Sequence, residues 1–396
     1  MKINYITGYA GTGKSTDLLN LLKTLPTATS IVLAPTHKAL VRLASSYQGN
    51  IELKTIHSLL GWIPGINENA THIAHIDTVI RLDRAIENYT HIVIDEAGMM
   101  SEDMLMNITG NLEELNNFET DHITIYLFLD PYQLLPVKGI QIQVDPLTTT
   151  NLTTQHRAES PDVVALFTKF VEYLQNINKM DLSTNDSENV MNTNSIKDFK
   201  LGDRLLAYTN DCVGSYNKLI AKHLNIRCYV GQEVQLGNKT DTVIVDSYVN
   251  PDLDQLKFLY ENQLLLLQNS NINSMFLDES LKALITNKYI KFISSDNRVI
   301  PVIEGIGEAY LIRNKAKESA IADKRKFADV YALNRAFTMD YVFASTVHKA
   351  QGSEFNNIWV VKSDIQKSIF GGSYKNYARL MYVAISRAKR KVYILS

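Results

Sequence analysis

The chain has 396 residues, of which 45% are hydrophobic and 21% are charged, and its formal net charge is −2. This length exceeds that of a usual single domain, so we expect two or more globular domains with full hydrophobic cores. There is no overall basicity to indicate nucleic acid, so a nucleic-acid interpretation must rest on local sites. The two cysteines, Cys212 and Cys228, have neither metal-ligand spacing nor a disulfide framework, which favours buried thiols in a reducing compartment.

The first residues, MKINYITGYAG, contain a short apolar run that is interrupted by Asn4 and Thr7. This pattern predicts a strand over residues 1–7 and not a signal peptide, and no later run approaches a transmembrane span. We therefore expect a cytoplasmic protein with no membrane partner, from a bacterium or from a host infected by a phage.

The first half of the chain alternates between strand-like and helical segments. A helix is expected over 14–25, where Pro26 ends it, and the short β-branched apolar runs that follow indicate strands at 30–36, 91–97 and 123–130. Helical spacing separates these runs, at 37–47 and 102–116. The alternation predicts a parallel sheet covered by helices on both faces. A further helix is expected at 161–177, before a polar linker or loop at 178–195.

A second α/β region begins at 203–211 and resumes in strand-like runs at 340–346, 357–361 and 391–395. The block between its parts has short β-rich runs and two helical pieces. We expect a first lobe at 1–150 with an insert at 61–80, a second lobe made of 151–227 and 340–396, and an inserted β-rich domain at 228–339.

The sequence GYAGTGKST, from Gly8 to Thr16, matches the phosphate-binding pattern G-x-x-x-x-G-K-[ST] between a predicted strand and a predicted helix. The glycines allow the backbone to turn its N–H groups toward phosphate oxygens, next to the helix N-terminus. Lys14 is expected to reach the β- and γ-phosphates of ATP, and the Ser15 hydroxyl to bind Mg²⁺. The expected nucleotide-binding residues of the loop are Gly8, Ala10, Gly11, Thr12, Gly13, Lys14, Ser15 and Thr16.

Two carboxylates, Asp95 and Glu96, follow the apolar run HIVI at the predicted carboxyl end of a parallel strand, where such sheets bind ligands. We expect Asp95 to belong to the Mg²⁺ coordination sphere. Glu96 is suited to orienting the attacking water and accepting its proton.

With these motifs in this order, the chain resembles the superfamily 1 helicases, in particular the Dda-like and RecD-like branch. The resemblance runs from residue 6 to 395, and the inserted block is its least defined part. It is carried by APTHKAL (34–40), TIHSLLG (55–61), LFLDPYQLLPV (127–137), LTTQHRAES (152–160), STVHKAQGSEF (345–355) and YVAISRAKRKVYIL (382–395). It implies two RecA-like P-loop NTPase lobes with parallel sheets, and movement along DNA from 5′ to 3′.

The resemblance also implies roles at the nucleotide. Gln133 corresponds to the sensor of the γ-phosphate, and Glu354 to the acidic residue that holds the ribose. Arg157 and Arg387 are far apart in the sequence, but arginines from two lobes can converge on one γ-phosphate and stabilise charge in the transition state. Either arginine could instead belong to a structural salt bridge, and Gln133 could be a turn amide.

Three Thr/His segments lie next to predicted strands, and their hydroxyls, imidazoles and helix N-termini suit contacts to phosphodiesters. Helix caps and filled core positions are the alternative interpretation of these residues. A narrow groove for single-stranded DNA needs few lysines, which agrees with the negative net charge. The expected DNA-binding residues are Pro35, Thr36, His37, Thr55, His57, Thr346, His348 and Lys349, together with Trp62.

Trp62 belongs to the 61–80 insert, whose turn signals place it where Dda-like enzymes carry the hairpin pin that splits the duplex. Trp62 could stack on a base or could be a packing residue. The block at 228–339 resembles, by position, an SH3-like accessory domain. Only seven residues precede Gly8, whereas the family usually has an upstream glutamine that reads adenine, so we expect loose discrimination between nucleoside triphosphates.

These features predict a monomeric, DNA-stimulated ATPase that unwinds duplex in replication, recombination or repair. Its expected partners are single-stranded DNA, junctions of single- and double-stranded DNA, and a single-strand-binding protein or replisome component. One alternative is a translocase that remodels forks with little unwinding. Another is a non-catalytic loader that uses ATP only as a switch. RNA as the track also stays open.

Overall fold

The computed structural model describes residues 1–59, 88–115, 119–136, 140–156, 158–175, 183–226, 229–230, 232–236, 242–250, 287–295, 298–322, 337–370 and 374–396. Its chain divides into two compact units, residues 1–192 with 350–394, and residues 193–349 with 395–396. Arg157, Trp62 and the predicted insert at 61–80 lie outside the described residues. Among the described helices, none has the length and apolar character needed to cross a membrane.

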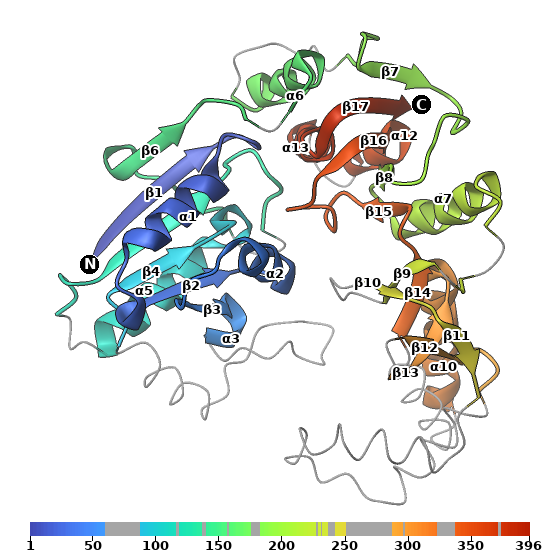
Figure 1. Cartoon of the computed structure of the whole chain (residues 1–396), viewed down its shortest axis with the longest axis horizontal. Helices are drawn as coiled ribbons and strands as arrows, with labels where there is room; N and C mark the ends of the chain where they lie inside the picture. Colours follow the sequence, from blue (N-terminus) through green and yellow to red (C-terminus); the bar gives the residue numbers. More distant parts are fainter. Residues whose placement is uncertain are drawn as a thin grey trace, which may run out of the picture. The chain divides into compact units, whose positions relative to one another are not determined.

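The first unit is built around a six-stranded sheet in the order β3-β2-β4-β5-β1-β6 (Figure 1). Every neighbouring pair in it is parallel, as the alternation of strand and helix predicts. The carboxyl ends of its strands therefore meet at one edge, where parallel sheets hold ligands. The strands are β1 (Lys2–Gly8), β2 (Ser30–Ala34), β3 (Glu52–Thr55), β4 (His91–Ile94), β5 (Thr124–Leu129) and β6 (Thr149–Leu152).

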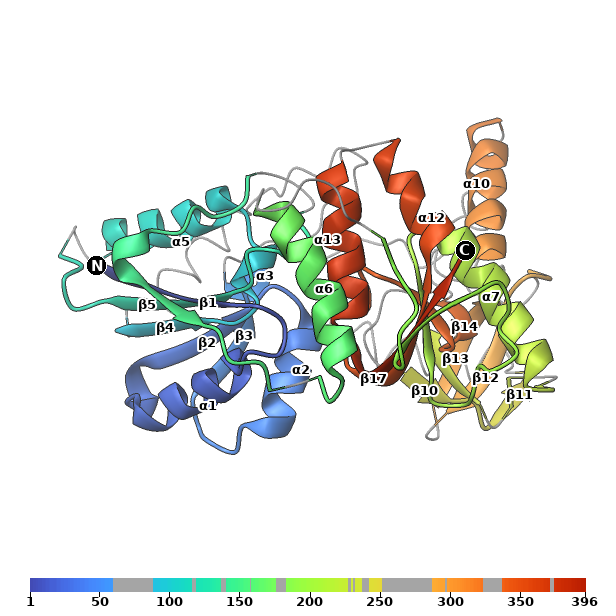
Figure 2. The same ribbon diagram turned by 90° about the horizontal axis from the view of Figure 1, so that it is seen from above.

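Helices cover both faces of this sheet, and strands such as β2 are therefore buried along their whole length. Helix α5 lies on one face, and α1 and α2 lie on the other (Figure 2). The helices of this layer are α1 (Lys14–Thr24), α2 (His37–Ser46), the single turn α3 (Ile56–Leu59) and α5 (Glu102–Leu115).

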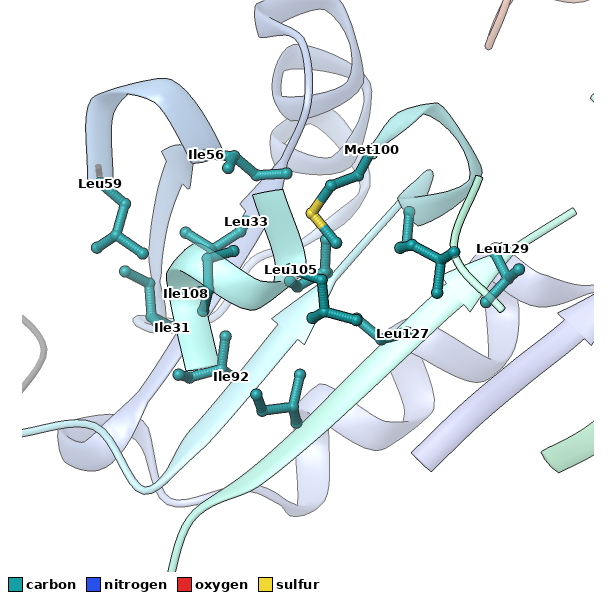
Figure 3. Close-up of a cluster of buried hydrophobic side chains, with 14 of the residues drawn as sticks. Ile31, Leu33, Ile56, Leu59, Ile92, Met100, Leu105, Ile108, Leu127 and Leu129 are labelled. Carbon is teal, nitrogen blue, oxygen red and sulfur yellow. The ribbon is translucent and has the colours of Figure 1, made fainter. Parts of the chain in front are cut away.

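The core on the α5 face is aliphatic. Leu105 and Ile108 of α5 contact strand residues such as Ile92 and Leu127, and Met100 closes the end of the cluster near the strand ends (Figure 3). On the opposite face, Leu18 and Leu22 of α1 pack with Val32 of β2. Burial of these side chains on both faces holds the edge of the sheet, where the site lies, in a fixed geometry.

The first unit also contains the last helices and strands of the chain. Helix α6 packs on α13 through edge-on contacts of Phe170 with Tyr377 and of Phe167 with Tyr382. Strands β16, β17 and β7 are neighbours in that order. The elements are α6 (Pro161–Leu174), β7 (Val190–Thr193), β16 (Phe355–Val361), α12 (Lys362–Gln366), α13 (Tyr374–Ile385) and β17 (Ala388–Leu395).

The second unit combines a small α/β part with a β-rich part. In the α/β part, β8 (Arg204–Ala207) pairs in parallel with β15 (Ala344–Thr346), and α7 (Asn210–His223) packs beside them. The β-rich part is a six-stranded sheet in the order β10-β9-β14-β13-β12-β11, with one parallel pair, β13 with β14. Its elements are β9 (Glu233–Leu236), β10 (Thr242–Ile244), β11 (Ser247–Val249), β12 (Lys291–Ser295), β13 (Arg298–Glu304), α10 (Ile306–Ala322) and β14 (Phe337–Tyr341).

The structure corrects one prediction of secondary structure. The polar segment 178–195 was expected to be a linker or loop, but Val190–Thr193 form strand β7. Its sequence, VMNT, has only one buried residue, because the strand lies at the end of its sheet. A polar edge strand of this kind does not show the apolar run that identifies buried strands.

Candidate active site

The glycine-rich loop joins β1 to α1, as predicted. Gly11 and Gly13 have φ angles of 84° and 88°, which side chains rarely tolerate. A Cβ atom on Gly8 would lie 2.3 Å from the Thr12 hydroxyl and 2.8 Å from the carbonyl oxygen of Leu152, so this position has no room for a side chain. Because Gly13 precedes α1 and has no side chain to cap it, the first N–H groups of α1 are suited to an anion.

Lys14 begins α1 and turns back over its own loop. Its ammonium group donates hydrogen bonds to the carbonyl oxygens of Gly8, at 2.6 Å, and Tyr9, at 2.7 Å. Ala10 is held by a different element, since its N–H donates to the Tyr382 hydroxyl of α13 at 2.7 Å. The Thr12 hydroxyl donates to the Tyr9 carbonyl at 2.9 Å. The loop is thus closed by local hydrogen bonds and by one contact from the C-terminal part of the chain.

Asp95 and Glu96 follow β4 at the carboxyl edge of the sheet. The Asp95 N–H donates to the carbonyl of Leu33 in β2 at 2.9 Å, which continues the ladder between the two strands. Glu96 then takes a left-handed conformation, with a φ of 52°, and its N–H donates to Oδ1 of Asp95 at 2.9 Å. Such a conformation costs about 1–3 kcal/mol for a residue with a side chain, and it is typical of functional sites.

A guanidinium group that the sequence analysis missed lies between these two carboxylates. Arg42 of α2 donates from Nη2 to Oδ2 of Asp95 at 3.1 Å and to Oε1 of Glu96 at 3.2 Å. Its Nη1 donates to the carbonyl of Gly352 at 3.2 Å. The sequence signal was a cation six residues after Thr36, on the helix that follows β2, the neighbour of β4.

Burial and charge shift the proton affinities of this cluster. Burial, followed by repulsion from Glu96, raises the pKa of Asp95 to about 6, although Arg42 opposes the shift. For Arg42, burial lowers the pKa, but the carboxylates of Glu96, Asp95 and Glu354 together outweigh it and raise the pKa above its usual value. The electrostatic cost of a buried carboxylate pair is thus offset in part by one guanidinium.

Gln133 and Arg387 also reach this region. Gln133 is only 5% exposed and accepts a hydrogen bond from the Gln351 amide at 3.5 Å. Arg387 is only 2% exposed, and its guanidinium donates to the carbonyls of Val383 at 3.1 Å and Ser353 at 3.4 Å. Both side chains are therefore held in place by polar partners.

Glu354 and two residues of the QHR segment complete the surroundings. Glu354 forms an ion pair with Lys389 at 3.3 Å. The Gln155 amide donates to the Ala10 carbonyl at 2.7 Å, and the His156 N–H donates to the Gly11 carbonyl at 2.8 Å. Gln155 and His156 thus attach to the glycine-rich loop, a contact that the sequence analysis did not foresee.

These segments line one cavity of about 400 Å³ in the first unit. Of the predicted nucleotide-site residues, Gly8 and Thr12 shape the loop without lining the cavity, and the position of Arg157 lies outside the described residues. The lining residues are Ala10, Gly11, Gly13, Lys14, Ser15, Thr16, Arg42, Asp95, Glu96, Phe128, Gln133, His156, Glu159, Glu354, Arg387 and Lys389.

The predicted DNA-binding threonines all act as local caps. The hydroxyl oxygens of Thr36, Thr55 and Thr346 accept backbone N–H groups three residues later, at 3.2, 3.0 and 3.3 Å. This agrees with the cap interpretation, and it leaves each hydroxyl hydrogen available to donate to a phosphate oxygen. A cap and a phosphate contact are therefore compatible in these residues.

The other predicted DNA-binding residues lie beside these threonines. Pro35 precedes Thr36, and His37 begins α2, although its side chain lies outside the described part of the chain. His57 is half-buried in α3. In the second unit, the His348 ring lies 6.1 Å from the Tyr208 ring, centroid to centroid, and burial lowers the pKa of Lys349, an effect that Asp340 opposes.

The comparisons with known proteins match both ends of the chain. The family model of an AAA domain matches residues 1–169, which contain the glycine-rich loop, the acid pair and Gln133. The family model of a UvrD-like helicase C-terminal domain matches residues 341–395, which contain Glu354 and Arg387. Both matches support the predicted resemblance to the superfamily 1 helicases. The branch within superfamily 1 stays a prediction.

Two curated relatives of this chain are uncharacterized proteins. One, from Methanocaldococcus jannaschii, is 21% identical over 461 residues, a match that covers 100% of this chain and 36% of the relative. The other, from Acanthamoeba polyphaga mimivirus, is 30% identical over 158 residues, which cover 35% of this chain and 30% of the relative. The matched region is thus about a third of the length of either relative.

A solved structure extends the likeness in fold to almost the whole chain. The crystal structure of the Pif1 helicase from Bacteroides, in complex with ADP-AlF3 and single-stranded DNA, matches with a TM-score of 0.51 at 16% identity. The match covers 99% of this chain and 88% of that chain. At this identity the likeness concerns the fold, and it confirms the predicted α/β class with two RecA-like lobes. The SH3-like character of the β-rich insert stays a prediction.

Proposed function

We propose that the chain is an ATP-dependent DNA helicase that translocates on single-stranded DNA from 5′ to 3′ and unwinds duplex in replication, recombination or repair. The observation that carries the proposal is the cavity of about 400 Å³ that gathers Lys14, Ser15, the acid pair, Gln133 and Arg387. These residues supply each part that phosphoryl transfer from ATP to water requires: phosphate donors, a base, a sensor and a cation.

The glycine-rich loop would hold the phosphates of ATP. The N–H groups at the start of α1 are suited to bind an anion, and Lys14 would leave the carbonyls of Gly8 and Tyr9 for the β- and γ-phosphates. Phosphate oxygens carry full negative charge, so they attract the ammonium group more strongly than neutral carbonyls do. Glu354, at the rim with Lys389, would contact the ribose.

Hydrolysis would then use the side chains at the strand ends. Glu96 would orient the attacking water and accept its proton, and its ion pair with Arg42 restrains its carboxylate. Arg387, together with Arg157, would stabilise the charge that develops on the γ-phosphate, an effect of about 10³–10⁵ in rate for arginines in this role. Gln133 would report the presence of the γ-phosphate to Gln351, its hydrogen-bond partner.

The donor set of the cavity fits a magnesium ion that accompanies the nucleotide. The Ser15 hydroxyl and the Asp95 carboxylate line the same cavity, and hard oxygen ligands of this kind are those that Mg²⁺ prefers. The described residues contain no group of three or more acidic, histidine or cysteine side chains arranged to hold a metal. This agrees with a metal that takes most of its ligands from phosphate and water. When bound, Mg²⁺ would neutralise charge on the phosphates.

Single-stranded DNA would be contacted by residues of both units. Thr36 and Thr55 of the first unit and Thr346 of the second each keep a hydroxyl hydrogen for a phosphodiester oxygen while they cap a backbone N–H. The likeness in fold to the Bacteroides Pif1 helicase, whose crystals contained ADP-AlF3 and single-stranded DNA, supports nucleotide and single-stranded DNA as ligands.

The first experiment measures ATP hydrolysis with and without a single-stranded oligonucleotide. The proposal expects DNA to stimulate hydrolysis by about tenfold or more, which corresponds to a lowering of the activation free energy by about 1.4 kcal/mol. Lys14→Ala should lower the stimulated rate by about 100-fold, because it removes a donor to the transferred phosphate.

The matched control is Lys54→Ala, which removes a lysine of β3 that pairs with Glu52 at 2.6 Å, in the same unit but outside the cavity. Its stimulated rate should stay close to that of the native protein. If DNA did not change the rate of ATP hydrolysis, the proposed contacts to single-stranded DNA would be wrong. If Lys14→Ala hydrolysed ATP at the native rate, the cavity would not be the site of hydrolysis.

A further inference from the structure

Arg42 forms an ion pair with each carboxylate of the acid pair, and it forms both from one nitrogen. Nη2 lies 3.1 Å from Oδ2 of Asp95 and 3.2 Å from Oε1 of Glu96. The arginine side chain is 30% exposed, whereas those of Asp95 and Glu96 are 8% and 12% exposed. A guanidinium therefore stands between two shielded carboxylates, where its positive charge has its largest effect.

Both oxygens of Asp95 are already engaged. Oδ1 accepts the Glu96 N–H at 2.9 Å, and Oδ2 accepts Nη2 of Arg42. A divalent cation that approached Asp95 would lie next to the guanidinium, and the two positive charges would repel each other at short range. The cation and the Arg42–Asp95 bond are therefore in competition for the same carboxylate.

Arg42 has partners that it could keep after leaving Asp95. Nη1 donates to the carbonyl of Gly352, and Oε1 of Glu96 stays within reach of Nη2. Gly352 has a φ of 73°, and a Cβ atom there would lie 3.5 Å from Nη1 of Arg42 and 3.9 Å from Oε1 of Glu96. The bare backbone of Gly352 thus packs directly against the Arg42–Glu96 pair.

We propose that Arg42 is the resident counter-cation of the Asp95–Glu96 pair: it yields Asp95 to the magnesium ion that arrives with the nucleotide, and it keeps Glu96 and the Gly352 carbonyl. Before the nucleotide binds, Arg42 holds two adjacent carboxylates together. Afterwards it is a positioning residue, because it holds the carboxylate of Glu96 in the direction from which that group meets water. The inference rests on the proposed function, which assigns Asp95 to the metal and Glu96 to the water.

The two roles predict effects of opposite sign when the charge is removed. Without the guanidinium, Asp95 loses the cation that competes with the metal, so less Mg²⁺ should be needed for nucleotide binding. Glu96 loses its orienting partner, so the turnover number should fall. If Arg42 only stabilised the fold, its replacement would not lower the Mg²⁺ requirement, because loss of structure at Asp95 weakens metal binding.

The test uses the full chain and a fluorescent ADP analogue, whose binding is titrated with Mg²⁺ at equilibrium. Arg42→Gln, which keeps a polar donor but removes the charge, should lower the half-saturating Mg²⁺ concentration by about fivefold. Arg42→Lys, which keeps the charge, should stay within about twofold of the native value. Lys54→Gln, which removes the cation of an ion pair outside the cavity, should leave it unchanged.

Steady-state hydrolysis at saturating Mg²⁺ supplies the second readout, and there the kcat of Arg42→Gln should fall by about tenfold or more. An unchanged or higher Mg²⁺ requirement in Arg42→Gln, with native binding intact, would overturn the role of Arg42 alone. If the native chain bound no nucleotide, both the proposed function and the role of Arg42 would be wrong. Should Arg42→Gln fail to fold, Arg42→Met, which also removes the charge, takes its place, with the same expected and contradicting results.

Discussion

The buried charge of Asp95 should lower the free energy of unfolding by a measurable amount in the absence of any ligand. Its pKa is raised to about 6, mainly by burial, so the folded chain holds a proton that the unfolded chain releases near the ordinary value of 3.8. Between these two values the unfolded state binds fewer protons, and stability therefore falls as the pH rises. Above pH 6 the cost is fully present. We predict that Asp95→Asn raises the free energy of unfolding by about 1–3 kcal/mol at pH 7.5, and by less at pH 4.5.

Thermal melting of the nucleotide-free protein at these two pH values checks this prediction. Asp186→Asn is the control of opposite sign, because hydrogen bonds from the Asn192 backbone and side chain lower the pKa of Asp186. Asp186 therefore contributes stability above its unfolded pKa, and its removal should bring no gain at pH 7.5. Equal melting temperatures for Asp95→Asn and the native chain at pH 7.5 would contradict the assigned cost.

At the scale of single residues, the sequence predicted the groups whose chemistry follows from a local pattern. The loop from Gly8 to Thr16 and the acid pair after β4 occur where strand and motif indicated, and the structure brings them together with Gln133 and Arg387 in one cavity. Arg42 was missed because its partners depend on the order of strands: α2 follows β2, and β2 lies beside β4. No local pattern contains that neighbourhood.

At the scale of elements, helix α13 fixes the back of the site through buried polar groups. The Tyr382 hydroxyl accepts the Ala10 N–H of the glycine-rich loop and donates to the Asp130 carboxylate. One turn earlier, Arg379 donates to the carbonyls of Pro131 at 2.8 Å and Gln133 at 2.6 Å. Burial and the Asp130 charge raise the pKa of Tyr382 well above its usual value, so the hydroxyl stays neutral and can donate.

We predict that Tyr382→Phe destabilises the chain by about 1–3 kcal/mol, because it leaves the Ala10 N–H and the Asp130 carboxylate buried without this partner. It should also weaken nucleotide binding, because the loop loses the contact that holds Ala10. Urea denaturation and titration with a fluorescent ADP analogue measure the two effects. Tyr377→Phe is the matched control on the same helix, since the ring contact with Phe170 survives the change. Equal losses in the two variants would contradict a specific role for the Tyr382 hydroxyl.

The sequence predicted β1, β2, β4 and β5 of the first sheet, because these strands are short apolar runs. It did not indicate the edge strands β3 and β6, whose sequences, ELKT and TTNL, are mostly polar. It predicted β7 wrongly, because Val190–Thr193 is a polar strand at the end of its sheet. The contact of α13 with the glycine-rich loop joins residues 372 positions apart. Long-range contacts of this kind depend on tertiary packing, which single-sequence patterns do not contain.

At the scale of the whole molecule, the predicted DNA-binding residues are divided between the two compact units. Thr36 and Thr55 belong to the first unit, which contains the cavity, and Thr346 belongs to the second. A motor requires such a division, because a strand advances only when two sets of contacts alternate their grip during the cycle of binding and hydrolysis. A protein that only bound DNA and ATP would not need ATP hydrolysis to be coupled to its DNA contacts.

We therefore predict that the chain displaces a strand from a duplex with a 5′ single-stranded tail in the presence of ATP and Mg²⁺. A duplex with only a 3′ tail should not be unwound. The direction follows from the resemblance to the Dda-like and RecD-like branch, and the requirement for a tail follows from the proposed contacts to single-stranded phosphates. Arg387→Lys, which keeps the charge but not the planar fork, should abolish displacement while DNA binding is retained. A fluorescent fork assay with both tails measures this. Displacement of a protein block from single-stranded DNA without strand separation would instead identify a translocase, and displacement from the 3′ tail would place the chain in a branch of opposite direction.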